Sequence, residues 1–218
     1  VDIEGQPIVE ARVENVVDTS RGTTIAQNGV RVYTVEHILA SVRGAGIDNI
    51  LIDINCEKPP IQDGSAKNMI ETLKSAGIVE QNAEREYLRI NKEVKYINEK
   101  IGAEITIVPA NDFRMEVSVD YNSKVLKPQT AVLEDMSDFE KEIAPCRTFV
   151  FFHELEMLLK YNLIKGGGNA LVIISQAGIG VGVGGVGLGR PFKPRPMAYP
   201  NTCHISIVFC LINKVVIA

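Results

Sequence analysis

The stretch YTVEHILASVRGAGIDNILIDINCEKPPIQDGSA, residues 33–66, contains the patterns of a helix, a strand and a tight turn in that order. Val35, Ile38, Leu39 and Val42 recur at helical spacing, and the glycines of 44–46 end that helix. Residues 49–55 carry isoleucine at every second position from 50 to 54, which is typical of a half-buried strand. The stretch therefore predicts a helix with Thr34 as its N-cap, then a strand, then a turn at 59–64.

The rest of the chain continues this alternation of helices and strands. Ser65 is predicted to cap a second helix that Gly77 closes, and the polar residues 79–86 are the best candidate linker. A capping box at 137–140 and apolar spacing over 153–164 predict two further helices. Strands are predicted at 87–97, 103–108, 113–121, 129–133, 147–152 and 169–174.

This order favours an α+β fold with two tandem β-α-α-β sandwich units, in which helices pack on one face of each sheet. The first unit is predicted at 1–80 and the second at 87–175. Residues 176–218 form a Gly-rich tail, which we call the C-terminal tail. The chain begins without Met and already resembles the middle of a domain, so its first strands are expected to be missing.

Composition excludes several classes of protein. The 218 residues carry a net charge of −4, which gives no general basic field to attract nucleic acid. No apolar run reaches the roughly 18 residues that a membrane helix needs. The start lacks the layout of a signal peptide, and the four cysteines are scattered without a CxxC pair. These features predict a cytoplasmic protein in a reducing compartment.

The composition changes abruptly near the C-terminal tail. All 27 acidic residues lie at or before Glu156, and GIGVGVGGVGLG follows from residue 178. One interpretation is a flexible glycine loop followed by a buried strand within 204–218. A second is a phosphate-binding GxGxxG, for example Gly180, Gly182 and Gly185, although so repetitive a tract matches this motif by chance. The third, which we favour, is that the coding frame was lost here.

Glu36 and His37 are the best candidates for chemistry. They lie side by side in the first turn of the predicted helix, away from its apolar stripe. A first-turn glutamate also complements the helix dipole, so the pair has a purely structural explanation. A neutral imidazole is nonetheless a common zinc ligand, and an adjacent carboxylate can take a proton from metal-bound water.

Several separated motifs resemble one family. TVEH, GIDN and the turn PIQDGSA occur in order within 34–66, and CRTFVFFHELEMLLKYNLIKGG with NALVI follows at 146–173. Together they resemble the UDP-3-O-acyl-N-acetylglucosamine deacetylases of lipid A, and hence lipopolysaccharide, biosynthesis. The resemblance covers about residues 1–174. It is strongest to the versions from Bacteroidota, which are often fused to a 3-hydroxyacyl carrier-protein dehydratase.

The resemblance implies a role for each matching residue. His37 matches the first zinc ligand, Glu36 the general base, and Thr148 a threonine that helps to hold the oxyanion. Asp63 and Ser65 match a turn that we interpret as structural. The substrate is implied to be a UDP-linked acyl-glucosamine, and the cofactor Zn²⁺. A small inserted β-α-β unit is implied to form the passage for its acyl chain, with the contacts Phe149, Leu155 and Leu159.

The C-terminal tail departs from the family pattern. The family completes its zinc site with R-H-K-x-x-D, and Ser206 and Cys210 stand where the His and Asp belong. His204 lies two positions early, and a rebuilt site with Cys203, His204 and Cys210 has no spacing to enforce it. The chain is therefore predicted to be an incomplete or inactive deacetylase. The alternatives are a non-catalytic binding domain of the same fold and, through the glycines, a nucleotide-binding module.

Overall fold

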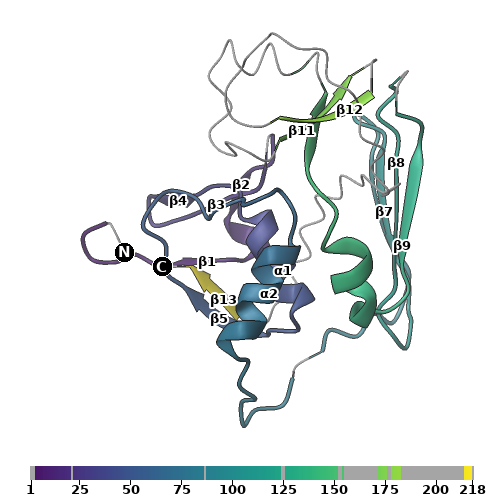
Figure 1. Ribbon diagram of the computed structural model, residues 1–218. Coiled ribbons are helices and arrows are strands. Elements are labelled where there is room, and N and C mark those ends of the chain that lie inside the picture. The colour runs from purple at the N-terminus through teal and green to yellow at the C-terminus, as the bar shows by residue number, and fades with distance from the viewer. Residues whose placement is uncertain are drawn as a thin grey trace.

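The computed structural model describes residues 3–20, 22–85, 87–123, 126–151, 154, 171–175, 178–182 and 214–217. Helices and small, mostly antiparallel sheets alternate along these residues, which confirms an α+β fold. The predicted helix at 153–164 lies outside them except for Glu154, which is helical. Figure 1 shows α1 and α2 beside the β1–β13–β5 sheet, with β7, β8 and β9 standing across from them.

The first half of the chain forms two sheets and two helices. Strands β2 (Val16–Asp18), β3 (Thr24–Gln27) and β4 (Val30–Val32) form an antiparallel sheet that follows the 3₁₀ turn η1 (Val13–Asn15). The central sheet has the order β1–β13–β5, from β1 (Val9–Glu10), β13 (Lys214–Ile217) and β5 (Asn49–Ile52). Helices α1 (Glu36–Gly44) and α2 (Lys67–Ala76) pack together beside it.

The second half contains two hairpins and a mixed sheet. β6 (Val94–Asn98) pairs with β7 (Ala103–Ile107), and β8 (Met115–Val119) pairs with β9 (Gln129–Leu133). A 3₁₀ turn, η2 (Met136–Asp138), leads into the π-helical turn η3 (Phe139–Ile143). β10 (Phe149–Phe151) then pairs in parallel with β11 (Leu171–Ser175), which pairs antiparallel with β12 (Gly178–Gly182).

The core that supports α1 comes from several elements. Ile38, Leu39 and Val42 of α1 are buried, as their helical spacing predicts. They pack with Val9 of β1 and with Ile25 of β3. The isoleucines at 50, 52 and 54 pack against the same cluster, although residue 54 lies beyond the end of β5. A second cluster joins α2 to η3 through Ile70, Leu133 and Phe139.

The predicted side-chain caps are wrong. Thr34 has φ 57°, in the left-handed region, and Val35 precedes the helix with no side-chain cap. The Ser65 hydroxyl donates to Asp63 Oδ1 at 2.7 Å, and α2 has Ala66 at its N-cap position with no side-chain cap. At 137–140 the cap is Asp135, whose carboxylate accepts from the Ser137 amide. At the starts of α1 and α2, backbone carbonyls elsewhere in the fold accept from the amides instead.

The glycine tract also differs from its phosphate-loop interpretation. Residues 178–182 are extended, and Gly180 and Gly182 lie opposite Ile173 and Leu171 in the sheet. A phosphate-binding loop needs backbone N–H groups that converge on one anion, and paired strand residues do not provide them. Gly185 lies outside the described residues. Within the part of the chain that the structure describes, no helix is long and apolar enough to cross a bilayer.

Candidate functional site

The carboxylate of Glu36 is held by a backbone segment that precedes it by 13 residues. Glu36 is the first residue of α1, and its Oε2 accepts a hydrogen bond from the Thr23 amide at 2.8 Å. The Thr23 carbonyl in turn accepts from the Val35 amide at 3.1 Å. Thr23 is 5% exposed, and its hydrogen bond with Glu36 is partly buried. This pair of contacts fixes the start of α1 and the direction of the Glu36 side chain.

Gly22 makes this arrangement sterically feasible. A Cβ atom at Gly22 would lie 2.9 Å from Glu36 Oε1, closer than side chains normally approach. The φ of Gly22 is 141°, which an L-residue with a side chain rarely adopts. Both features therefore favour glycine at this position. The carboxylate rests directly against the backbone of residues 22 and 23.

His37 follows Glu36 and is half-buried. Burial lowers the pKa of the His37 imidazole, and the nearby Glu36 and Asp63 carboxylates oppose that shift. The lowered pKa favours the neutral imidazole, which is the form that binds a metal ion. The His37 carbonyl accepts from the Ser41 hydroxyl at 2.8 Å, and this hydroxyl also lies 3.3 Å from the Ala66 carbonyl. Ser41 thus links α1 to the turn before α2.

The turn at 63–66 connects His37 to the second half of the chain. The Asp63 carboxylate accepts from the Ser65 amide at 3.1 Å and from the Ser65 hydroxyl, which shapes the turn. The Gly64 carbonyl accepts from the Thr148 amide at 3.0 Å, and the Asp63 carbonyl accepts from Arg147 Nε at 2.7 Å. The carbonyls of the turn therefore hold the segment that carries Thr148. The charge of the Asp63 carboxylate also raises the pKa of His37, against the effect of burial.

Some of the other predicted site residues lie in the part of the chain that the structure describes, and some lie outside it. Thr148 is half-buried and immediately precedes β10. Phe149 is 8% exposed and makes edge-to-face contacts with Tyr121 and Phe151, with ring centroids 5.4 Å apart in each pair. Leu155 and Leu159 lie outside the described residues. The structure thus places Phe149 in an aromatic cluster beside the segment bound by the 63–66 turn.

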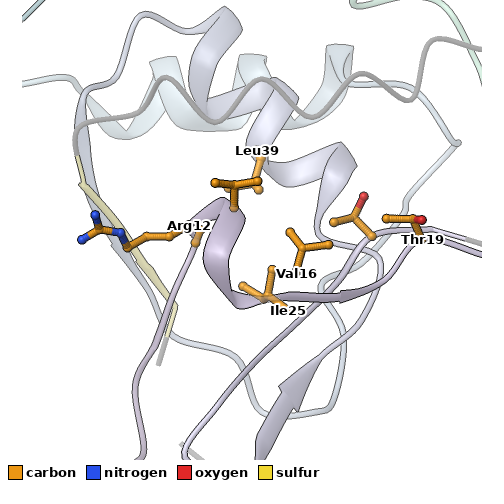
Figure 2. A pocket seen from close by; sticks show the side chains of 8 residues that line it. Arg12, Val16, Thr19, Ile25 and Leu39 are labelled. Atoms are coloured by element: carbon orange, nitrogen blue, oxygen red, sulfur yellow. The ribbon is translucent and has the colours of Figure 1, made fainter. Parts of the chain in front are cut away.

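A cavity of about 190 Å³ lies next to the segment that holds Glu36. Figure 2 shows Leu39 and Ile25 pointing toward one another across it, with Val16, Thr19 and Arg12 at its sides. Thr23, whose amide binds Glu36, is also part of the lining. The remaining lining residues are Ala11 and Val13. Most of its lining is apolar, and it comes from η1, β2, β3, α1 and the segments beside them.

The described residues do not by themselves complete a zinc site. A catalytic zinc has three protein ligands, and the described residues bring together no three His, Cys, Asp or Glu side chains suited to a metal. His37 is the single imidazole in this part of the chain, because His153 and His204 lie outside it. The site as described therefore places a half-buried imidazole beside a carboxylate that the Thr23 amide holds.

Gly22 and Thr23 are the functional-site residues that sequence reasoning missed. Their contacts with Glu36 span 14 positions for Gly22 and 13 for Thr23, and they depend on the pairing of β2 and β3. One available signal was Asn28-Gly29, the usual turn of a tight hairpin. Both residues have positive φ, 52° and 79°, and they join β3 to β4. That hairpin brings Thr23 back against the start of α1.

The fold and the site together define an α+β protein with a carboxylate–imidazole pair at a helix start. The family model described as "UDP-3-O-acyl N-acetylglycosamine deacetylase" matches residues 1–181. The chain belongs to this family.

Curated relatives agree with this assignment. The bifunctional enzyme LpxC/FabZ of Bacteroides thetaiotaomicron is 43% identical over 178 residues, which cover 81% of this chain and 39% of that protein. The corresponding enzyme of Porphyromonas gingivalis is also 43% identical, over 81% of this chain and 38% of its own length. The UDP-3-O-acyl-N-acetylglucosamine deacetylase of Saccharophagus degradans is 39% identical, over 78% of this chain and 58% of its own length. The chain thus spans about two fifths to three fifths of these relatives.

Proposed function

We propose that this chain carries part of the site for zinc-dependent hydrolysis of the N-acetyl group of UDP-3-O-acyl-N-acetylglucosamine, with release of acetate, in lipid A biosynthesis. Family membership and the name of the Saccharophagus degradans relative support this substrate. The observation that carries the proposal is the Glu36 carboxylate, held by the Thr23 amide next to the half-buried His37.

Each residue has a role that suits its surroundings. One oxygen of Glu36 accepts from Thr23, so the carboxylate is oriented while keeping lone pairs to take a proton from an attacking water. The neutral His37 imidazole would be one zinc ligand. The Thr148 hydroxyl would donate to the developing oxyanion. Zinc, when bound, polarises the carbonyl and lowers the pKa of water.

The acyl chain of the substrate would lie along apolar and aromatic side chains. Phe149, which follows Thr148, forms an aromatic cluster with the partly buried Tyr121 and Phe151. Leu155 and Leu159 complete the proposed passage. β10 and β11 pair in parallel, which requires a crossover between them and supports an inserted β-α-β unit. We place this unit in the second of two tandem sandwich units.

The longer relatives suggest the wider context. Two are named bifunctional enzymes LpxC/FabZ, which supports fusion to a 3-hydroxyacyl carrier-protein dehydratase in a longer protein of this kind. A cytoplasmic location fits a UDP-linked substrate. A second candidate function is a non-catalytic binding domain of the same fold. It is favoured because the described residues supply one imidazole and no three-ligand cluster.

Acetate release from UDP-3-O-acyl-N-acetylglucosamine, measured with added zinc, separates the two functions. Glu36→Gln keeps the shape of the side chain but removes the base, so a deacetylase should lose about 10²–10⁴-fold in rate. Glu99→Gln is the matched control, because Glu99 is exposed and lies in the turn between β6 and β7. Loss in the first variant and not in the second supports the deacetylase. Substrate binding without acetate release from the unmodified chain supports the binding domain.

A further inference from the structure

The cavity beside the segment that holds Glu36 has a buried floor and an exposed rim. The buried lining residues form the floor, and these are Ala11, Thr23, Ile25 and Leu39. The exposed lining residues form the rim, and these are Arg12, Val13 and Thr19. Three of the floor residues belong to the core that supports α1. The cavity therefore leads from the solvent to this core.

The charges around the cavity favour an uncharged occupant. Among the described lining residues, Arg12 carries the only charged side chain. Its guanidinium lies 3.7 Å from a carboxylate oxygen of Glu10 and 3.6 Å from one of Glu14. Figure 2 shows the Arg12 side chain extending away from Leu39 and Ile25. Its charge is thus compensated by two carboxylates outside the cavity, which disfavours an anionic ligand.

Water gains little on the floor of this cavity. A buried water typically makes about three hydrogen bonds to polar groups that would otherwise lack a partner. The Thr23 amide already donates to Glu36, and the Thr23 carbonyl already accepts from Val35. Among the described residues, no buried side-chain nitrogen or oxygen lacks a partner. An apolar occupant can therefore displace water here at little cost and gain contact with Ile25 and Leu39.

We propose that this cavity binds an uncharged hydrocarbon group of about the size of a benzene ring. Its volume is about 190 Å³, and an apolar cavity of about 150 Å³ is large enough for one benzene molecule. The bound group would contact Thr23, whose amide holds Glu36. Because the group binds only while the wall at Thr23 is in place, it stabilises the Thr23–Glu36 hydrogen bond against local opening. The cavity is thus a site through which an apolar effector acts on Glu36.

Nuclear magnetic resonance with benzene as the probe tests the site. In a methyl-labelled chain, benzene should bind saturably and give cross-peaks to the methyl groups of Ile25 and Leu39. Ile105 of β7 is the control, because it is 61% exposed and does not line the cavity. No saturable binding would overturn the site. Equal cross-peaks to Ile105 would do so too, because benzene would then adsorb to exposed apolar side chains.

Two neighbouring valines of β2 provide matched variants. Val16 lines the cavity, whereas Val17 is 51% exposed and is not part of the lining. Val16→Phe places a larger side chain in the cavity and should raise the dissociation constant of benzene at least about tenfold. Val17→Phe should change this constant less than about twofold. Equal affinity in the two variants would contradict the site. If Val16→Phe does not fold, the cross-peaks in the unmodified chain decide.

Amide exchange measures the link to Glu36. With benzene at ten times its dissociation constant, openings that disrupt the wall become about tenfold rarer, so the Thr23 amide should exchange about tenfold more slowly. The amides of β7 are the control, because the β6–β7 hairpin contributes no residue to the lining. Unchanged exchange at Thr23 in the saturated chain would refute the link. These measurements need neither zinc nor acetate release, so their outcome is separate from that of the proposed deacetylase.

Discussion

The side chain of Glu36 is positioned by backbone atoms of Gly22 and Thr23. Its carboxylate binds the Thr23 amide and rests against Gly22, whose φ of 141° leaves the approach open. The Glu36-His37 pair could be found from its position in the TVEH motif. Gly22 and Thr23 could not, because their part in the site depends on the folding of β2 and β3 onto the start of α1.

Gly22→Ala should lower the free energy of unfolding by about 1–3 kcal/mol, since it combines an unfavourable φ with a contact to Glu36 Oε1. Gly29→Ala is the matched control, because Gly29 has φ 79° and a Cβ there would meet no atom within 4 Å. Urea unfolding of both variants checks this. An equal loss in the two would show that neither the φ of Gly22 nor the approach to Glu36 adds to the cost of a side chain there.

His37 gives a pH dependence of known sign. Burial lowers the pKa of the His37 imidazole in the folded chain, while the unfolded chain has the ordinary value of about 6.5. Below that pH the unfolded state binds a proton that the folded state does not, so stability falls as the pH falls. In the presence of a chelator, His37→Asn should therefore lose less stability than the unmodified chain between pH 7.5 and 5.5.

Urea unfolding at the two pH values measures this difference. Background carboxylates titrate in both proteins and cancel in the comparison. An identical pH dependence in the variant would show that the His37 pKa is not lowered.

At the scale of elements, the hydrophobic periods of α1, α2 and β9 predicted their location well. The predicted side-chain caps of α1 and α2 were wrong, because backbone carbonyls distant in the sequence accept from the amides at the starts of these two helices. The Thr23 carbonyl accepts from Val35 at the start of α1. The Ala144 carbonyl accepts from the Ala66 and Lys67 amides at the start of α2. A local pattern carries no information about such partners.

Gly44, the last residue of α1, permits close packing of three elements. A Cβ there would meet the Phe139 ring of η3 at 2.3 Å and Ile70 of α2 at 3.0 Å. Gly44→Ala should thus lower the free energy of unfolding by about 1–3 kcal/mol through overpacking, although alanine favours helix formation. Combining it with Phe139→Leu should recover part of the loss, as measured by a double-mutant cycle. Additive losses would show that the two residues do not contact each other.

At the scale of the whole molecule, the α+β class followed from the order of elements, and the family from separated motifs. The central position of β13 did not, because a short apolar segment in a carboxylate-free tail carries no signal of its pairing partner. The turn at 63–66 joins the halves through backbone contacts to the segment 144–148. The positions of the Glu36-His37 pair and of Thr148 thus depend on contacts that form only in the folded chain.

Zinc binding by the purified chain tests the central claim, that His37 is a metal ligand. A competition titration on the unmodified chain and on His37→Asn gives the stoichiometry and the affinity. We predict that the unmodified chain binds zinc and that His37→Asn raises the dissociation constant at least about tenfold, which corresponds to about 1.4 kcal/mol of binding free energy. Zinc binding that is unchanged by His37→Asn, or no zinc binding by the unmodified chain, would contradict the role of His37.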